Sequence, residues 1–449
     1  MFTKNQIIDL EITGLTNEGC GVGKADGIVV FVPFTAVGDK LKCKIVKVSR
    51  SHCYGIIDEI VLPSPDRIKP DCEAFGKCGG CDFRHISYEA ELRAKDTFIR
   101  DAFTRIGGIK PQFLPIIPNC NENEYRNKAQ YPVRKNDNGE IQCGFFAGRS
   151  HRIIPCDNCR LEQPVFGEIK RFILEYAKEY KISAYNETEH SGVLRHICVR
   201  KGHYSGEISV TVVVRRFVPQ LKPLASALVK KFPEIKSITA NINKDKTNVI
   251  YGSEERLLYG VPTITDMMCR KNFSVSPMSF YQVNTPMAEV LYQKAAELAK
   301  PDGKTIIDLY CGAGTIGLTM ADKAKEIIGV EIVESAVANA IENAKLNHAE
   351  NVRFICGDAG QATDILVSEG AKADVVIVDP ARKGCDERTL SNIIRFAPER
   401  IVMISCNAVT AARDCSYLEK NGYKCQNVQG VDLFSRTSHV ECVILLTAR

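Results

Sequence analysis

Three side chains in the last third of the chain are of the types that covalent and acid–base chemistry require: Asp379, Cys406 and Glu441. Asp379 directly follows the apolar run 374–378, Cys406 follows the run 400–404 by two residues, and Glu441 lies inside the run 440–446. Apolar runs of this length are typical of buried strands. Because the carboxyl ends of strands in an open parallel sheet border one crevice, we expect Asp379 and Cys406 to lie close together, with Glu441 facing the same crevice.

A glycine-rich loop precedes these side chains in the same region. Residues 306–309 predict a strand, and the residues after it include glycines at positions 312, 314 and 317. This spacing lets the backbone approach a nucleotide closely and matches the fingerprint of dinucleotide-binding enzymes. Glu331 ends the next predicted strand, at the spacing expected for an acid that accepts hydrogen bonds from ribose hydroxyls. A turn that needs glycine only for its geometry is the simplest alternative.

Carboxylates near this loop distinguish two kinds of cofactor. Asp308 lies in the strand just before the loop, and Asp358 follows the third predicted strand. A nicotinamide dinucleotide places its pyrophosphate at a helix N-terminus and has no need of these acids. S-adenosylmethionine is cationic at sulfur and carries an ammonium group, so nearby carboxylates favour it electrostatically. A dehydrogenase remains the alternative.

A thiolate, a carboxylate and a methyl donor in one crevice suit methylation at C5 of uracil, which is too weak a nucleophile to take a methyl group directly. Attack of the Cys406 thiolate on C6 makes C5 carbanion-like; C5 then accepts the methyl group, a base removes the C5 proton and the thiolate leaves. The thiol must be activated, because its ordinary pKa is about 8.5. A buried structural cysteine is the alternative, since the chain has 19 cysteines.

Three regions must position these groups. Residues 1–60 have short β-type runs broken by glycines, which predicts an OB-like β-barrel. Residues 72–270 begin with a cysteine cluster and contain strand-like runs, which predicts a central α+β domain. Residues 271–449 alternate strands and helices, which predicts a doubly wound, Rossmann-like α/β domain.

Two finer patterns lie in the first two regions. Lys40, Lys42 and Lys44 alternate with apolar residues, so a strand would present the three lysines on one face. That face could contact phosphates or could simply be a solvated edge. In the second region, the turn residues 243–245 predict a hairpin between the runs 237–242 and 248–251.

Five cysteines have a spacing that suits metal ligation. Cys72, Cys78 and Cys81 are clustered, and Cys156 and Cys159 follow much later. Zinc sites and iron–sulfur clusters both use four thiolates. The spacing alone is compatible with either centre and with either of the two later cysteines as the fourth ligand.

The composition limits the remaining classes. With 45% hydrophobic and 25% charged residues the chain is typical of globular proteins, and no apolar run reaches the roughly eighteen residues of a membrane span. The first ten residues do not predict a signal peptide, so we expect the reducing cytoplasm and no disulfide framework. The net charge of +5 permits a nucleic-acid partner without requiring one.

The chain resembles the bacterial uracil-C5 RNA methyltransferases, and most closely the branch that acts on 23S ribosomal RNA. Several motifs carry the resemblance in the correct order, and they are Phe280-Tyr281-Gln282-Val283-Asn284, Asp308-Leu309-Tyr310-Cys311-Gly312-Ala313-Gly314, Asp379-Pro380-Ala381-Arg382, Ser405-Cys406-Asn407 and His439-Val440-Glu441. Two loops depart from the family pattern, with Ala381 in place of the second proline after Asp379 and Ala408 in place of the proline after Asn407. Because both loops keep their polar residues, we expect altered loop stiffness and retained activity.

The resemblance implies a role for each motif. Cys406 would be the nucleophile and Glu441 the base that removes the C5 proton. S-adenosylmethionine would be bound by Gln282, Tyr310, Thr315, Glu331, Asp358 and Asp379. The first region would be a TRAM domain that holds RNA, and a [4Fe–4S] cluster would be bound by Cys72, Cys78, Cys81 and Cys159, with Cys156 as the alternative to Cys159.

The sequence therefore predicts a cytoplasmic, monomeric methyltransferase that acts on 23S ribosomal RNA and has no membrane partner. A transfer-RNA T-loop uridine methyltransferase with the same chemistry is the first alternative. The second is a non-catalytic RNA-binding protein with a degenerate methyltransferase fold, against which the intact Cys406, Glu441 and Asp379 argue.

Overall fold

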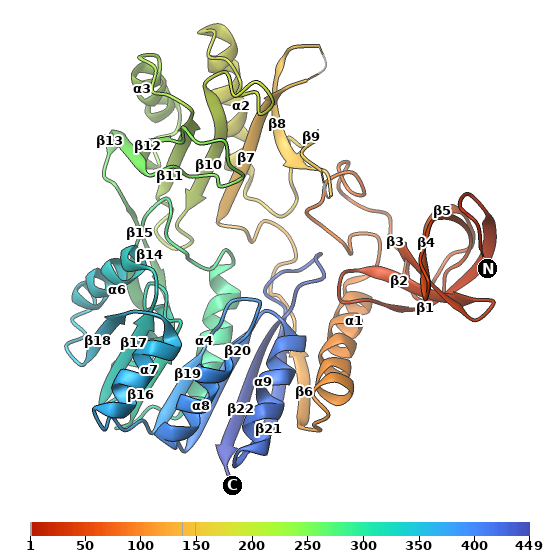
Figure 1. Ribbon diagram of the computed structural model, residues 1–449. Helices are drawn as coiled ribbons and strands as arrows, with labels where there is room; N and C mark the ends of the chain where they lie inside the picture. Colours follow the sequence, from red (N-terminus) through yellow and green to blue (C-terminus); the bar gives the residue numbers. More distant parts are fainter. Residues whose placement is uncertain (1, 137, 149) are drawn as a thin grey trace.

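The N-terminal residues form a closed five-stranded barrel, at the right of Figure 1. The structure is a computed structural model that describes residues 2–136, 138–148 and 150–449. The barrel strands follow the order β1-β2-β3-β5-β4, with β1 (Ile7–Leu15), β2 (Cys20–Ala25), β3 (Ile28–Pro33), β4 (Lys40–Val48) and β5 (His52–Leu62). In β4, Leu41, Cys43 and Ile45 are buried while the lysines at 40 and 42 are exposed and Lys44 is half-buried. The predicted barrel and its lysine face are both confirmed.

The central region is a seven-stranded sheet with helices on one face, at the top of Figure 1. Its strands, in spatial order, are β13 (Glu254–Gly260), β12 (Ile235–Ile242), β11 (Ile208–Val214), β10 (Leu194–Lys201), β7 (Lys128–Lys135), β8 (Ile141–Phe146) and β9 (Ile153–Pro155). Helices α2 (Pro164–Glu179) and α3 (Leu221–Lys231) bury their apolar sides in the same core as these strands. The opposite face of β7 and β10 carries polar side chains, among them Lys128, Gln130 and Arg200.

The predicted hairpin at 243–245 is wrong. Strand β12 pairs antiparallel with β13, and residues 248–251 are not a strand. Asn243 explains the difference, because its side-chain amide donates to the carbonyls of Val249 and Ile250 at 2.8 and 3.0 Å. These bonds close a loop at the place where the sequence suggested a second strand.

The C-terminal region contains an eight-stranded sheet, at the bottom of Figure 1. Its strands, in spatial order, are β18 (Val352–Cys356), β17 (Glu326–Glu331), β16 (Thr305–Leu309), β19 (Val375–Val378), β20 (Arg400–Ser405), β22 (Glu441–Ala448), β21 (Tyr423–Val431) and β6 (Gln112–Ile117). All neighbours are parallel except β22, which is antiparallel to β20 and β21. The strand order reverses between β16 and β19, which is where such sheets bind ligands.

Helices cover both faces of this sheet, so its central strands are buried on both sides. One face packs against α1 (Tyr88–Asp101), the π-helix 102–106, α7 (Ala359–Ser368), α8 (Glu387–Phe396) and α9 (Ala408–Lys420). The other packs against α4 (Thr285–Ala299), α5 (Thr315–Met320), α6 (Glu334–Leu346) and the hairpin of β14 (Ile264–Met268) and β15 (Lys271–Val275). The predicted doubly wound α/β class is confirmed. None of the helices in the described ranges combines the length and apolar character of a membrane span.

One strand of this sheet comes from a distant part of the chain. Strand β6 lies before the central domain in sequence but pairs in parallel with β21 at the edge of the C-terminal sheet. Helix α1 precedes it and packs on the same sheet. The central sheet is therefore inserted between segments that belong to the C-terminal sheet, which the predicted boundary at residue 271 does not anticipate.

Candidate active site

Cys406 lies in the short connection between β20 and α9. Asn407 caps the helix, its side-chain oxygen accepting from the Val409 backbone N–H at 3.1 Å. The half-buried thiol faces Glu441, Arg382 and Asp379. Burial and the two carboxyl groups raise the pKa of Cys406 to about 11, whereas Arg382 opposes that shift. A group that stabilises the thiolate is therefore required for Cys406 to act as a nucleophile.

Asp379 and Glu441 lie at the same end of the sheet as Cys406. Asp379 directly follows β19, and Glu441 is the first residue of β22, with 5% of its surface exposed. Burial raises the pKa of Asp379 to about 7. Burial and the nearby Asp379 raise the pKa of Glu441 to about 8. Carboxyl groups that titrate near neutral pH can accept a proton and release it again, as an acid–base catalyst must.

The loops after β19 and β20 are tied together. The Arg382 carbonyl accepts from the Asn407 side-chain amide at 3.0 Å and from the Thr410 hydroxyl at 3.3 Å. The exposed Arg382 guanidinium lies 3.2 Å from the His439 ring. These contacts hold the two loops in register even though Ala381 and Ala408 replace stiffer prolines.

The segment that leads into Glu441 is fixed from outside the sheet. Asp432 accepts from the Tyr88 hydroxyl and from the Lys95 ammonium, each at 2.6 Å. The Ser438 N–H donates to the Asp82 carboxylate at 2.8 Å, and the Asp82 N–H donates to the Arg436 carbonyl at 2.9 Å. Helix α1 and the segment around Asp82 therefore anchor the approach to Glu441.

The glycine-rich loop after β16 has the conformation of a nucleotide-binding turn. Gly312 and Gly314 have φ of 55° and 77°, values that glycine adopts without strain, and Gly314 is the N-cap of helix α5. Glu331 accepts from the Gly312 N–H at 3.0 Å and from the Val333 N–H at 2.9 Å. The acid predicted at the end of β17 thus lies against the loop.

Asp308 leaves one acceptor unsatisfied beside this loop. Its Oδ2 accepts from the Gly317 N–H at 3.0 Å, but its buried Oδ1 has no hydrogen-bond partner. Burial raises the pKa of Asp308 to about 7, and the nearby Asp379 adds to the rise. Because buried acceptors are almost always paired, Asp308 suits a bound cation or N–H donor, as S-adenosylmethionine would provide.

Gln282 and Thr315 both contact the hydroxyl of Tyr292, which lies between them. The Gln282 carbonyl accepts from the Asn127 side chain at 2.8 Å, and Gln282 is only 8% exposed. The Tyr292 hydroxyl lies 3.3 Å from the Thr315 hydroxyl and faces Gln282, Asp379 and Glu441. Tyr292 was not predicted, because a tyrosine in an amphipathic helix gives no signal that separates it from a core residue.

The other two predicted cofactor residues follow strands of the same sheet, Tyr310 after β16 and Asp358 after β18. Tyr310 directly precedes the glycines in a left-handed conformation, with φ of 65°, and its phenol faces Cys385. Asp358 is the N-cap of α7 and accepts from the Gln361 N–H at 3.2 Å. Asp358 therefore has a structural role whether or not it contacts a cofactor.

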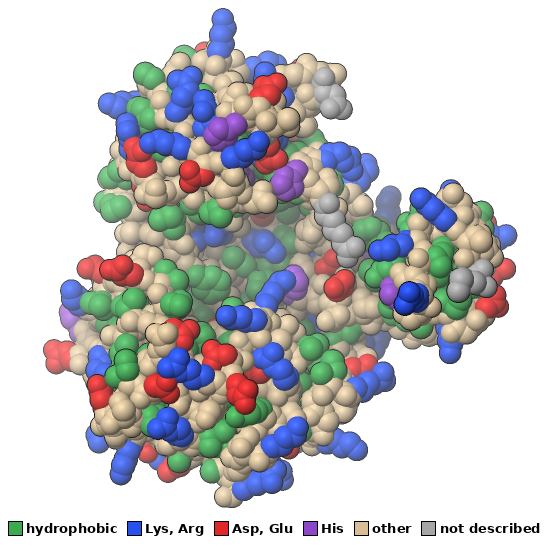
Figure 2. Space-filling view, viewed as in Figure 1, with side chains coloured by type: hydrophobic (Ala, Val, Ile, Leu, Met, Phe, Trp, Pro, Cys, Tyr) green, Lys and Arg blue, Asp and Glu red, His purple; other side chains and the backbone are tan. Residues whose placement is uncertain are grey.

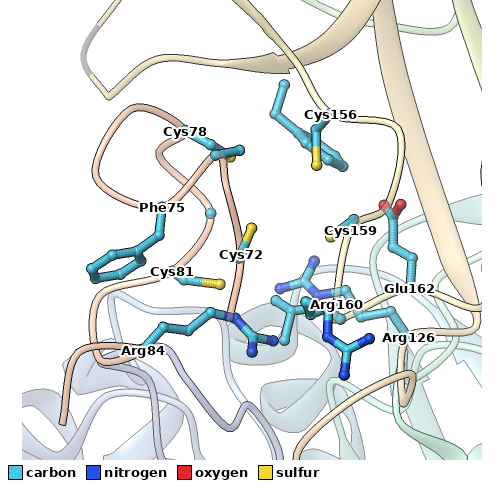
Figure 3. Close-up of a pocket in the computed structure, with 14 residues that line it drawn as sticks. Cys72, Phe75, Cys78, Cys81, Arg84, Arg126, Cys156, Cys159, Arg160 and Glu162 are labelled. Atoms are coloured by element: carbon cyan, nitrogen blue, oxygen red, sulfur yellow. The ribbon is translucent and has the colours of Figure 1, made fainter. Parts of the chain in front are cut away.

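The five cysteines singled out by spacing line one cavity of about 100 Å³, shown in Figure 3. Cys72, Cys78 and Cys81 come from the segment before α1, and Cys156 and Cys159 from the segment after β9. The Cys156 thiol contacts both Cys72 and Cys159, and those contacts lower the pKa of the latter two. The buried Arg84 and the half-buried Arg126 each have a buried Nε without a partner beside these thiols.

A metal centre is not formed by these side chains as they stand. Within the described part of the chain, no three His, Cys, Asp or Glu side chains lie so that they could hold a metal ion. The donor set is nevertheless that of a thiolate-ligated group, with two arginines that would offset its negative charge. The cavity also exceeds the roughly 10–15 Å³ that one water molecule requires.

Comparisons with known proteins cover the whole chain. Residues 87–449 match the family described as tRNA (Uracil-5-)-methyltransferase, and residues 2–57 match the TRAM domain. An uncharacterized RNA methyltransferase of Halalkalibacterium halodurans is 42% identical over 99% of this chain and 97% of its own length. Another, from Clostridium tetani, is 40% identical over the same shares of the two chains.

A solved structure extends this similarity to three dimensions. The tRNA (uracil-54, C5)-methyltransferase of Pyrococcus abyssi, in complex with S-adenosyl-L-homocysteine, superposes with a TM-score of 0.78 at 26% sequence identity. The match covers 98% of this chain and 100% of that chain, so the barrel and the central region are part of the similarity.

Proposed function

This chain belongs to the tRNA (Uracil-5-)-methyltransferase family and is an S-adenosylmethionine-dependent RNA methyltransferase, and on that premise we propose that it methylates C5 of a uridine in 23S ribosomal RNA through a covalent Cys406 adduct. One observation carries the mechanism: Cys406, Asp379 and Glu441 adjoin three neighbouring strands and face one another beside the glycine-rich loop.

The proposed steps use these three side chains. The Cys406 thiolate adds to C6 of uracil, which places the displaced electron pair on C5 and the O4 carbonyl. C5 would then take the electrophilic methyl group of S-adenosylmethionine as the sulfur–methyl bond breaks, which would leave S-adenosyl-L-homocysteine. The Glu441 carboxylate removes the proton from C5, and the electrons of that C–H bond restore the C5–C6 double bond as the C6–S bond breaks. Cys406 leaves as a thiolate, ready for another cycle.

We assign cofactor binding to Gln282, Tyr310, Thr315, Glu331, Asp358 and Asp379. Glu331 lies where it could accept from a ribose, and the unsatisfied Asp308 oxygen supplies a further acceptor close to Asp379. Thr315 and Gln282 adjoin Tyr292, which faces the two acids of the active site. These residues would hold the methyl donor between the glycine-rich loop and Cys406.

We also propose that Cys72, Cys78, Cys81 and Cys159 bind a [4Fe–4S] cluster, with Cys156 as the alternative fourth ligand. The support is the shared cavity, the thiol donors and the adjacent arginines. Thiolate ligation would pull these loops closer together than they lie in the structure. No step of the methyl transfer involves this group.

The RNA substrate is the finer part of the proposal. The lysine face of β4 and the arginine-rich cysteine region would bind RNA on either side of the target loop. A long ribosomal segment requires such additional contacts. Transfer RNA is the second candidate, because the Pyrococcus abyssi tRNA enzyme matches 98% of this chain and so includes comparable regions. We further propose that the enzyme works as a monomer in the cytoplasm.

Deletion of the gene followed by mass spectrometry of 5-methyluridine in separated RNAs tests the substrate. We expect the 23S ribosomal signal to fall by one or more residues per molecule and the transfer-RNA signal to stay unchanged. Loss of the transfer-RNA signal alone would reject the ribosomal substrate while leaving the chemistry intact.

A further inference from the structure

Two cationic side chains, Lys128 and Arg200, lie where the central sheet meets the loop that carries Gln282. Lys128 of β7 and Arg200 of β10 are directly opposite each other in the antiparallel ladder, so both side chains point to the same face. The Arg200 guanidinium donates to the Ser279 carbonyl at 2.8 Å. The neighbouring Asn127 donates to the Gln282 carbonyl at 2.8 Å. This end of the central sheet is therefore in direct contact with the loop that carries Gln282.

Neither cation has a counter-ion among the residues that the structure describes. Arg200 is only 5% exposed, and its Nε and Nη1 atoms make no hydrogen bond. Half-buried Lys128 makes neither a hydrogen bond nor an ion pair within the described part of the chain. The groups that face Arg200 are Tyr251, Tyr281 and Cys198, none of which is a carboxylate.

This arrangement is unfavourable unless an anion joins it. Buried charges in proteins are normally paired, and two adjacent like charges repel each other. Burial lowers the pKa of Arg200 to about 10, and burial together with Arg200 lowers that of Lys128 to about 8. Arriving negative charge would raise both pKa values again and use the idle guanidinium N–H groups.

The position of the pair indicates which anion arrives. Ser279, to which Arg200 donates, directly precedes Phe280, whose side chain is 71% exposed. Figure 2 shows a hollow between the central and C-terminal regions with Lys and Arg side chains inside it. An RNA strand that delivers a base to the active site must bring its phosphates along this hollow. Arginine matches a phosphate with its planar N–H fork, and lysine adds a point charge.

We propose that Lys128 and Arg200 form a binding site for a backbone phosphate of the substrate RNA, next to the nucleotide that is methylated. The inference rests on the proposed function and adds the residues that hold the strand. Arg200 has two tasks in this site, because one N–H supports the Ser279–Phe280 turn while the others receive the phosphate. Lys128 has only the second task and is therefore the better residue to test.

The test compares Lys128→Met with Lys128→Arg and with the control Lys178→Met in the full-length protein. Methionine keeps the length of the side chain and removes its charge, so the unfolding temperature should not fall. Lys178 is exposed on α2, which covers the other face of the central sheet. The readouts are oligouridylate affinity over a range of salt concentrations, S-adenosylmethionine affinity without RNA, and KM and kcat for methylation of 23S RNA transcript.

We expect Lys128→Met to weaken RNA binding roughly tenfold, as for a lost charged hydrogen bond. The slope of log affinity against log salt should become shallower by about 0.7, the value for one phosphate contact on a single strand. KM for RNA should rise more than kcat falls, Lys128→Arg should retain affinity, and Lys178→Met should match the wild type. Arg200→Lys, which keeps the charge and loses the fork, should weaken RNA binding without changing the salt slope.

Two results would overturn the proposal. Unchanged RNA affinity and salt slope in Lys128→Met would show that no phosphate binds there, even while the wild type methylates RNA in the same assay. A fall in S-adenosylmethionine affinity with unchanged RNA affinity would show that the anion is the carboxylate of the cofactor. If the wild type methylates none of the RNAs tested, the result would instead count against the proposed function.

Discussion

The active-site crevice and the cysteine cavity both gather thiols and charged groups, but different kinds of backbone hold them. Asp379, Cys406 and Glu441 each adjoin a strand of one sheet, so the ladder of hydrogen bonds fixes their spacing. Cys72, Cys78 and Cys81 lie in an irregular loop, in which Cys78 forms one isolated bridge with Ala147. The crevice is preorganised by the fold, whereas the cavity would be organised by the group it binds.

The largest expected effect is the loss of the nucleophile. Cys406→Ala should abolish methyl transfer, because no other group can bond to C6, while S-adenosylmethionine binding and the unfolding temperature change little. RNA with 5-fluorouridine at the target should form a covalent adduct with the wild type, since fluorine cannot leave as a proton. The exposed Cys120→Ala is the control. An adduct with Cys406→Ala, seen by denaturing electrophoresis, would assign the nucleophile elsewhere.

Removal of the base should slow the reaction without preventing attack. Glu441→Gln leaves Cys406 in place but cannot accept the C5 proton, so turnover should fall by roughly 10²–10⁴-fold. A methylated covalent protein–RNA species should accumulate with ordinary RNA and be visible by mass spectrometry. Normal turnover would mean that Asp379 or another group removes the C5 proton, and the assignment of Glu441 as the base would be wrong.

The stability of the cysteine region should depend on the cluster that we propose it binds. Anaerobically purified protein should be brown and contain about four irons per chain. Cys159→Ser should remove the colour and lower the unfolding temperature, whereas Cys156→Ser should retain both. Metal analysis and visible absorption give the answer, and a colourless protein with one zinc per chain would contradict the cluster.

The smallest expected effect is on the pH dependence of stability. The folded-state pKa of Asp308 and Asp379 is about 7 and that of Glu441 about 8, all above their ordinary values. Groups with raised pKa stabilise the fold while protonated. This stability is fully present below the ordinary carboxyl pKa of about 4 and is lost progressively as pH rises to the folded-state pKa values of 7 to 8. The unfolding temperature of the cofactor-free protein should therefore fall between about pH 4 and pH 8, and these groups should add no further fall above that range.

Two glutamine variants divide this effect between the two regions. Glu441→Gln removes one titrating group from the crevice, and Glu162→Gln removes the cavity's buried acid, whose pKa burial raises to about 8. Each substitution should make the decline of the unfolding temperature with rising pH less steep. If neither changes the slope, the raised pKa values do not govern stability in this pH range.

Strand boundaries were predicted most accurately from the sequence where burial on both faces of the sheet produces unbroken apolar runs. Strands β16, β19 and β20 were placed to within a residue at each end. That accuracy follows from the parallel sheet, whose central strands exclude polar residues. The same runs located Asp379 and Cys406 at one crevice, although the roles assigned to the surrounding cofactor residues stay predictions.

Prediction failed where tertiary contacts decide the local structure. Strand β6 contains Pro115 and has half-exposed and exposed residues throughout, so only its pairing with β21 makes it a strand. The apparent hairpin after β12 is a loop because Asn243 bonds to two of its carbonyls. Tyr292 and the Lys128–Arg200 pair were equally invisible, since their significance lies in which distant groups they face.

The edge position of β6 has a consequence for how the protein folds during synthesis. Its contacts with β21 join residues more than 300 positions apart, as in the Gln429–Pro115 hydrogen bond with a separation of 314. At about 5–20 residues per second, α1 and β6 leave the ribosome roughly 15–60 seconds before β21 exists to receive them. The central sheet can fold in that interval, while α1 waits with its apolar side uncovered. Chaperone dependence and sensitivity to translation rate should therefore concentrate in this early segment.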